Sequence, residues 1–534
     1  MTAGRLLALT GLIAFWGLAL AQPHLPGLYY DEAADAAPAV ELLAGKPVEP
    51  ARGVGIDLLG RTLPVMVMDY VGAVSTYLYI PWFALFGVGV LQLRLLPIAG
   101  GMVALALAAV LGRRWLGPVP AGLGVVLGAV HPSFVFWTRQ GVHVSSLLGL
   151  LATASLLTLD SWVRTGRPRW AYLTALLFGL GLGVKLLFVW WGPALVLYLW
   201  VRSGPKAGQF IGQILRPGRL ALCALGVLAG AWMPLYYNLR SGGTLETLAA
   251  NFWRTSYGVE NWRVLDNLRT AFDQLLVLVR GDHFWFLGGQ FGNPLYPPIL
   301  VGALAVALAG GALSRGRSGS WRLLAGLAGI IVLVTAQSAF TVSGLWPTHL
   351  YLLMPLPQIL TVGVIYQVAG ILPGRPGRAV TTGLALLAVL LLGGGDLWAD
   401  LSYHRALAET GGWLRMSDAI YRLADYLAAE PDRPVLALDW GIAAPVVVLT
   451  EARVVPVELF FYQAQAPPEL ADILYGYASR FPRARYVFHA PEATVYERRA
   501  EFERVAAALG RRPVLEFTTR QRDGKPVHLV YSLE

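Results

Sequence analysis

Long runs of apolar residues recur along most of this chain, and they constrain its fold more than any other feature. About eleven of these runs are long enough, or nearly so, to cross a bilayer as helices. They lie at 6–20, 95–112, 118–137, 143–162, 170–184, 186–201, 219–238, 297–314, 322–342, 350–372 and 379–395. Only 14% of the 534 residues are charged, against about a quarter in soluble domains. The sequence therefore predicts a polytopic α-helical membrane protein.

The first apolar run has two interpretations. Arg5 precedes it, and the small residues before Gln22 are typical of a cleaved signal peptide. Its length also suits a membrane-spanning helix, and ten further runs follow. We therefore expect this first helix to be retained.

Basic residues between the runs predict how the chain is oriented. They cluster at every second junction, and such clusters mark the cytoplasmic side of a membrane protein. The basic junctions are 113–114, 164–169, 202–219, 315–322 and 375–378. The formal net charge of +10 comes largely from these clusters, which do not form a stripe suited to nucleic acid. We expect a multi-pass protein of the bacterial inner membrane, with the remaining junctions outside.

Residues 70–90 are also apolar, but counting them as a span would place Arg113 and Arg114 outside. We therefore interpret this segment as a helix at the outer membrane interface. Its aromatic residues suit that position; they include Tyr70, Tyr77, Tyr79 and Trp82. The outer face then carries a long first loop, 23–94, and a second large loop, 239–296.

The composition changes after about residue 396, where charged residues become frequent. We expect a membrane domain over 1–395 and a soluble extracytoplasmic α/β domain over 396–534. Strands are expected at 435–439, 453–457, 486–489, 514–518 and 527–531, and helices at 468–481 and 495–509. This domain has no Gly-rich phosphate loop and no catalytic set, so the sequence assigns it no chemistry.

Three carboxylates follow the first span closely, in a chain that is poor in acids: Asp31, Glu32 and Asp35. One interpretation is structural. Asp31 would cap a helix running to about Gly45, and Glu32 would interact favourably with the positive helix N-terminus. The other interpretation is catalytic, because a capping contact also holds a carboxylate rigidly at the membrane surface. The residues alone leave both open.

Several further segments agree, in order and spacing, with one known family. They are the apolar segment Tyr79–Gly87, the entry Leu93–Pro97 into the next span, the basic turn Leu111–Gly117, and the segments Phe136–Arg139 and Gly181–Lys185. With the acidic pair, they resemble the GT-C membrane glycosyltransferases, and most closely the relatives of protein O-mannosyltransferases and of the lipid A aminoarabinose transferase. The resemblance covers about 25–200 well, the rest of the membrane part by architecture, and 396–534 hardly at all.

The resemblance implies transfer of a sugar from a polyprenyl phosphate (undecaprenyl or decaprenyl phosphate) to an extracytoplasmic acceptor, with inversion at the anomeric carbon. Asp31 would be the general base, and Glu32 would orient it or raise its pKa. Cations would hold the lipid phosphate, and the candidates are Lys185, Arg139, Arg94 and Arg240. For Lys185 and Arg139, snorkelling to the lipid headgroups is the alternative.

Candidates for substrate binding are Tyr30, His143, Trp262, His349 and Tyr351. Structural roles compete at several of them. The histidines suit an interfacial position, and Trp262 belongs to a group of aromatic residues that also suits an interfacial helix. Leu350 replaces an arginine that relatives often carry, which weakens the assignment around it.

The expected partners are the lipid-linked sugar donor, an acceptor of protein, lipid or glycan type, and the bilayer, with no nucleic acid. No cofactor is expected to be required; a divalent cation, which some relatives hold, is not favoured, because the loop 138–143 has no acid. The alternative function is a polytopic transporter or a lipid-linked glycan flippase, which the few charges in the spans argue against. A polysaccharide polymerase or ligase would differ mainly in its acceptor.

Overall fold

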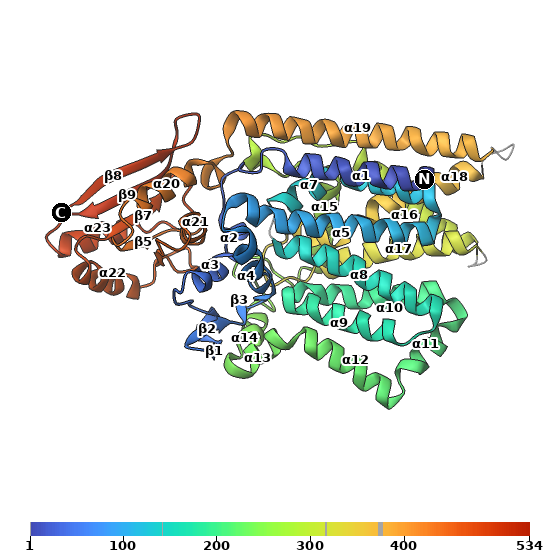
Figure 1. Ribbon diagram of the computed structural model, residues 1–534, viewed down its shortest axis with the longest axis horizontal. Coiled ribbons are helices and arrows are strands. Elements are labelled where there is room, and N and C mark those ends of the chain that lie inside the picture. Colours follow the sequence, from blue (N-terminus) through green and yellow to red (C-terminus); the bar gives the residue numbers. More distant parts are fainter. Residues whose placement is uncertain (1, 141–142, 315–317, 372–376) are drawn as a thin grey trace.

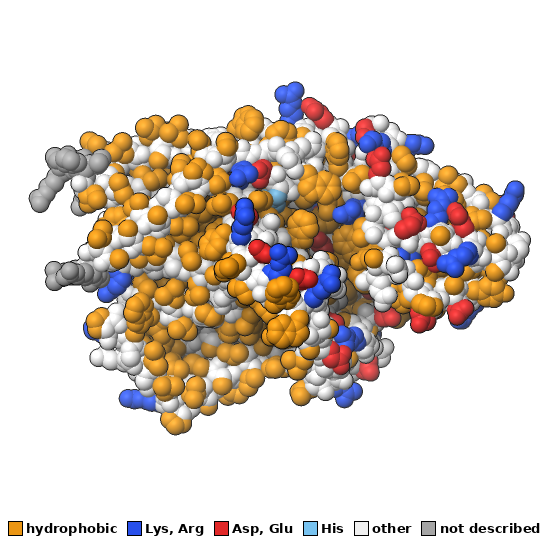
Figure 2. All heavy atoms as spheres, turned by 180° about the vertical axis from the view of Figure 1, so that it is seen from behind, with side chains coloured by type: hydrophobic (Ala, Val, Ile, Leu, Met, Phe, Trp, Pro, Cys, Tyr) orange, Lys and Arg blue, Asp and Glu red, His pale blue; other side chains and the backbone are white. Residues whose placement is uncertain are grey.

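The computed structural model describes every residue except 1, 141–142, 315–317 and 372–376. Figure 1 shows a bundle of long helices with a smaller domain at one end, and the N-terminus at the opposite end of the bundle. Hydrophobic side chains cover the bundle surface in Figure 2, whereas charged side chains gather on the smaller domain and at the boundary between the two parts. This distribution is that of a membrane protein with one soluble domain.

Seven helical segments are long and apolar enough to cross a membrane in the described part of the chain. Five are single helices, namely α1 (Ala3–Leu20), α5 (Val90–Leu116), α8 (His143–Thr165), α16 (Tyr296–Leu313) and α17 (Gly319–Gln337). A sixth joins η2 (Leu186–Trp190), α10 (Trp191–Ser203), η3 (Gly204–Lys206) and α11 (Ala207–Ile214). The seventh is α19 (Arg378–Thr410).

Three bent pairs raise the number of spans to as many as ten. The pairs are α6 (Pro118–Ala129) with α7 (Pro132–Arg139), α12 (Pro217–Gly230) with α13 (Trp232–Ser241), and η5 (Pro347–Leu353) with α18 (Leu356–Gly370). Their bends are 59°, 70° and 55°. A proline lies at or near each break, Pro132, Pro234 or Pro355, and proline cannot donate the backbone hydrogen bond that would continue a helix.

The remaining expected run, 170–184, corresponds to α9 (Arg169–Val184), which has 16 residues. The segment expected at the membrane interface forms α4 (Val74–Phe86), a helix of 13 residues. At about 1.5 Å per residue, α4 is too short to cross a core of about 30 Å.

One predicted boundary was wrong. The last span was expected to end near residue 395, but α19 continues to Thr410, with 33 residues in all. Asp396 and Asp400 suggested the end of a span, yet both are fully buried on this helix. Because these two buried acids lie on a membrane helix, the expectation of few buried charges in the spans is wrong as well.

The first loop folds into short elements beside the bundle. They are α2 (Tyr30–Ala33), α3 (Ala37–Leu43), η1 (Ala51–Gly53), β1 (Gly55–Leu58), β2 (Arg61–Pro64), β3 (Met66–Met68) and β4 (Val71–Gly72). Strand β1 pairs antiparallel with β2, and β3 with β4. The second loop contains α14 (Gly243–Ala250), α15 (Val264–Arg280) and η4 (Trp285–Leu287).

The C-terminal domain is a five-stranded mixed sheet with strand order β6-β5-β7-β9-β8. The strands are β5 (Val435–Ala437), β6 (Val457–Glu458), β7 (Arg485–His489), β8 (Pro513–Arg520) and β9 (Pro526–Leu533). Four of the five expected strands are confirmed, whereas β6 reaches only the last residue of the expected segment 453–457. The helices are η6 (Leu414–Met416), α20 (Ala419–Ala428), α21 (Ala443–Leu449), α22 (Glu469–Arg480) and α23 (Arg499–Ala508).

Alternation along the strands gives this sheet two apolar faces. Leu436 and Tyr486 pack with α22 and α23 on one face, and Val435 and Val487 pack with α20 and α21 on the other. The domain also rests on the first loop. Val447 and Val448 of α21 belong to the same buried cluster as Ala33 and Ala37.

Candidate active site

The acidic pair lies in the first turn of α2, at the end of the bundle that faces the C-terminal domain. Neighbouring residues of a helix point about 100° apart. Glu32 is accordingly buried, whereas Asp31 stays partly exposed. The predicted cap was wrong. Tyr29 precedes the helix, and the helix expected to reach Gly45 is broken into α2 and α3.

Glu32 forms a buried, two-pronged ion pair with Arg94 of α5. Both Arg94 Nε and Nη2 donate to its carboxylate at 2.8 Å. The same guanidinium also donates to the carbonyl oxygens of Pro23, Leu25 and Pro26, at 2.9, 3.0 and 3.1 Å. Arg94 is therefore fully used in holding the chain between α1 and α2, and it is removed from the candidates for phosphate binding. Both carboxylate oxygens of Glu32 are engaged by Arg94, and its predicted role of orienting Asp31 or raising its pKa stays a prediction.

Lys185 lies between α9 and η2 and interacts electrostatically with Asp31. Its backbone is extended and bridges Val71 of β4, and the next amide, that of Leu186, donates to the carbonyl of Tyr70 at 3.0 Å. Glycine is required where these strands meet, because a Cβ at Gly72 would overlap the carbonyl oxygen of Gly183. The first loop thereby fixes the lysine in place.

The charges around Asp31 adjust its proton affinity. Burial raises the pKa of Asp31, while Lys185 and then Arg415 lower it. Burial also raises the pKa of Asp35 to about 7, and one of its carboxylate oxygens has no hydrogen-bond partner in the described structure. Lys185 interacts electrostatically with both acids. The sequence-predicted pair of Asp31 and Lys185 is thus brought together, and both side chains are partly exposed.

Arg139 is placed differently from the prediction. It is fully buried in the last turn of α7, where it donates to the carbonyl oxygens of Gln22 and Leu25 at 2.5 and 3.0 Å. A lipid phosphate has no access to a guanidinium in this position. Arg240, at the end of α13, is exposed and forms no ion pair with any residue that the structure describes.

The predicted substrate-binding residues whose side chains the structure describes separate into three groups. Tyr30 lies at the site, next to Asp31, and His349 of η5 interacts electrostatically with Lys185. Tyr351 is buried, stacks on Phe134 and hydrogen-bonds Thr138 at 2.5 Å, so it belongs to the core. Trp262 is exposed in the second loop. The side chain of His143 lies outside the described residues.

Sequence reasoning missed the part of the site that the C-terminal domain contributes. Arg415 interacts electrostatically with Asp31 and lies 5.7 Å from the ring centroid of Trp440. Tyr30 lies 4.9 Å from the Trp440 ring, and its hydroxyl lies 3.2 Å from that of Tyr462. These residues are separated from Asp31 by about 400 positions, and no local pattern around them pointed to a site.

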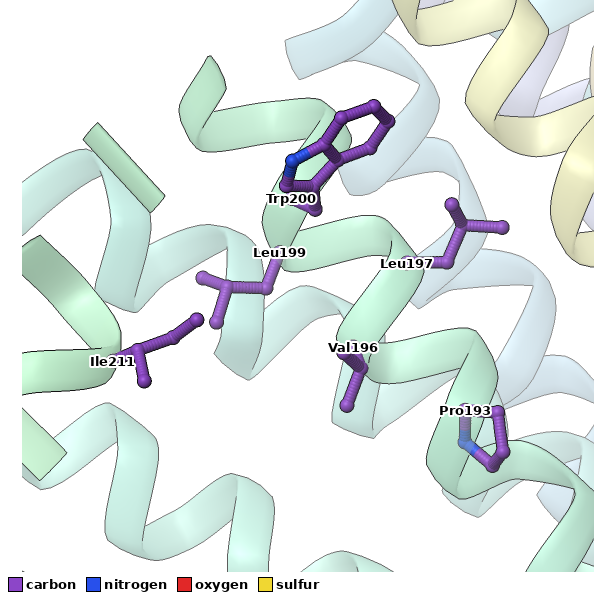
Figure 3. A pocket seen from close by; sticks show the side chains of 6 residues that line it. All are labelled: Pro193, Val196, Leu197, Leu199, Trp200 and Ile211. Atoms are coloured by element: carbon purple, nitrogen blue, oxygen red, sulfur yellow. The ribbon is translucent and has the colours of Figure 1, made fainter. Parts of the chain in front are cut away.

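Two cavities lie apart from these residues. One of about 590 Å³ is lined by apolar side chains of α10 and by Ile211 of α11, which Figure 3 shows. It carries no acid or cation and has no means of catalysis. The other, of about 360 Å³, lies where the start of α15 and the residues before it meet the segment that follows α17. Its lining includes Glu260, Arg263 and Asp266.

Within the described residues, no three His, Cys, Asp or Glu side chains are grouped so that they could hold a metal ion. The expectation that no cofactor is required stays a prediction, since nothing here tests it.

Comparisons with known proteins agree on the membrane part and extend to the whole chain. Residues 73–252 match the family described as dolichyl-phosphate-mannose-protein mannosyltransferase. ArnT from Cupriavidus metallidurans in the apo state has a similar structure, with a TM-score of 0.63 and 13% identity over 98% of this chain and 97% of that one. The same protein bound to undecaprenyl phosphate gives a TM-score of 0.58 and 14% identity over the same shares. Curated protein sequences give no match. Because the structural likeness includes 396–534, it reaches beyond the region in which the sequence resemblance was expected.

Proposed function

We propose that this chain is a membrane glycosyltransferase of the GT-C type and that it transfers a sugar from a polyprenyl phosphate to a hydroxyl group of an extracytoplasmic acceptor. The family match over residues 73–252 and the ArnT-like fold support this proposal. Asp31 is the general base of this reaction, and Lys185 binds the phosphate of the donor. A single observation carries the proposal: Asp31 and Lys185, from segments far apart in the chain, interact at one partly exposed site. A solved structure of similar fold holds undecaprenyl phosphate, which supports a donor of this class.

In the proposed step, the acceptor oxygen attacks the anomeric carbon of the donor sugar. A new bond forms between this carbon and the acceptor oxygen, and the bond to the phosphate oxygen breaks with its electron pair. The proton of the acceptor hydroxyl passes to the Asp31 carboxylate. The negative charge that develops on the phosphate is stabilised by the Lys185 ammonium. Attack from the face opposite the phosphate inverts the anomeric configuration.

The test compares Asp31→Asn with wild type in liposomes that contain a polyprenyl-phosphate-linked sugar. Asn keeps the size of the side chain but accepts no proton, so we expect the rate of transfer to fall by about 10²–10⁴-fold. Asp273→Asn on α15 is the matched control, because Asp273 is exposed. Transfer at the wild-type rate by Asp31→Asn would remove the base from the mechanism.

Lys185 is tested in the same assay by Lys185→Gln. A cation that binds the donor phosphate in the ground state should change mainly the KM for the donor, whereas one used in the transition state should lower kcat. Lys206→Gln is the control, since Lys206 is exposed and directly precedes α11, which lies away from the C-terminal domain (Figure 1). Wild-type kinetics for Lys185→Gln would return Lys185 to the snorkelling interpretation.

A further inference from the structure

Aromatic rings of the C-terminal domain contact Tyr30, the residue that precedes Asp31. We define the aromatic wall as Tyr30 of α2 with Trp440, Tyr462 and Tyr496 of the C-terminal domain. Tyr30 contacts Trp440 and Tyr462 as described above, and the rings of Tyr462 and Tyr496 lie 6.0 Å apart. Tyr462 is 57% exposed although it touches the first loop, so its ring is accessible to a ligand.

One buried carboxylate holds much of this wall in place. Asp439 is 1% exposed and accepts the backbone N–H groups of Trp440 and Tyr496, both at 2.8 Å. It also contacts Nδ1 of the buried His489 at 3.0 Å. Because these partners come from the segments after β5 and after β7, Asp439 ties two of the wall residues to the sheet. The wall is therefore a rigid feature of the domain and not a group of loose surface rings.

Polar groups border the aromatic wall on two sides. On one side, Arg415 lies over the Trp440 ring and interacts electrostatically with Asp31, and its Nε has no hydrogen-bond partner in the described structure. On the other side, Glu458 of β6 interacts electrostatically with Tyr30 and Tyr462. A site that combines flat aromatic faces with hydroxyl, guanidinium and carboxylate groups suits a ligand with an apolar face and many hydroxyl groups.

Resting on the proposed function, we propose that the C-terminal domain forms the acceptor side of the site and that the acceptor is a glycan. One sugar ring lies against the aromatic wall, with its nucleophilic hydroxyl toward Asp31. A peptide acceptor fits this surface less well. A peptide that binds by strand addition needs main-chain hydrogen bonds to a strand edge, and the edge strand β6 has only two residues.

The experiment uses the full-length protein in liposomes with the lipid-linked sugar donor. Transfer is measured to two probes, namely the oligosaccharide fraction released from the cell envelope of the source organism and a mixture of Ser/Thr-containing peptides. Tyr462→Ala and Trp440→Ala each remove a ring from the wall. We expect the apparent KM for the oligosaccharide to rise by about tenfold, with a much smaller change in the KM for the donor. Tyr462→Phe, which keeps the ring, should recover most of the loss.

Tyr475→Ala is the matched control, because Tyr475 is an exposed tyrosine of the same domain on α22. Because Tyr462 is exposed, Tyr462→Ala should leave the fold intact, so the test does not depend on Trp440→Ala alone. Transfer to peptides only, transfer to neither probe with donor still cleaved, or an unchanged KM in both ring variants would overturn the glycan assignment. Failure of the proposed function gives a different result: the wild type would not cleave the donor at all, and Asp31→Asn would match it.

Discussion

At the scale of single residues, the two adjacent carboxylates of α2 have opposite surroundings. Glu32 is sealed in an ion pair with Arg94, whereas Asp31 faces Lys185 and Arg415 and stays partly accessible. A structural carboxylate and a proton-accepting one should respond differently to the same substitution.

We expect Glu32→Gln to lower stability strongly and Asp31→Asn to leave it nearly unchanged. Removing one charge of a buried ion pair leaves the other uncompensated, which costs about 3–5 kcal/mol. Thermal unfolding of the two variants in detergent measures the difference. Equal melting temperatures for both variants would contradict the division of roles within the pair.

The second prediction at this scale concerns pH. A general base must be ionised, so kcat/KM should fall as the pH drops through the pKa of Asp31. Arg415 lowers this pKa; Arg415→Gln should therefore raise it and move the acidic limb of the pH profile to higher pH. Arg405→Gln is the control, because Arg405 is exposed on α19 and pairs only with Glu409 in the described structure. A limb that stays in place, or moves to lower pH, would separate Arg415 from Asp31.

At the scale of elements, the membrane helices pack through small residues. A Cβ on Gly122 of α6 would lie 2.7 Å from the carbonyl oxygen of Gly4 and from Cβ of Leu7, both on α1. Close approach of backbones through glycine is typical of membrane helix pairs. Gly122→Ala must push α1 and α6 apart, and we expect a loss of about 1–3 kcal/mol.

Gly17→Ala on α1 serves as the comparison, because nothing lies within 4 Å of a Cβ at that position. Gly17→Ala should not destabilise the protein, because Ala favours a helix over Gly by up to about 1 kcal/mol. The same unfolding assay reports both variants, and similar losses for the two would mean that packing of α1 against α6 contributes little.

Most of the membrane elements could be predicted, because hydropathy over about twenty residues is a strong signal. Each expected run has a counterpart among α1, α5 to α13 and α16 to α19, including the bent pairs. Short elements such as β1 to β4 and α21 could not, since a few residues carry too little periodicity. Helix α20 was missed although its apolar residues recur at helical spacing. The end of α19 was missed because burial of Asp396 and Asp400 depends on neighbours that the sequence does not reveal.

At the scale of the whole molecule, the C-terminal domain lies at one end of the helical bundle and the N-terminus at the other (Figure 1). The basic junctions predict that the C-terminal domain is outside and the loop at 164–169 inside. In a Cys223→Ser background, Arg167→Cys and Asp432→Cys, both exposed positions, should react from opposite sides with a membrane-impermeant thiol reagent. Labelling of both from one side would invert or break this topology.

The candidate site was only half visible from the sequence. Asp31 and Lys185 came from a resemblance to known enzymes, and their local motifs lie within the first 200 residues. Arg415, Trp440 and Tyr462 approach Asp31 because the C-terminal domain packs on the first loop, through α21 and through Tyr421, whose hydroxyl donates to the carbonyl of His24. A contact across about 400 positions of the chain is a property of the fold, and no spacing in the sequence encodes it.

The uninterrupted α19 limits where residues can be inserted into or deleted from this protein. Each residue of a helix adds about 1.5 Å and a rotation of about 100°. One residue inserted before Thr410 would therefore turn the C-terminal domain away from Tyr30 as well as raise it. A flexible linker would absorb such a change, but a continuous helix transmits it. We expect insertions and deletions among close relatives to accumulate in the outer loops and to be rare within 378–410.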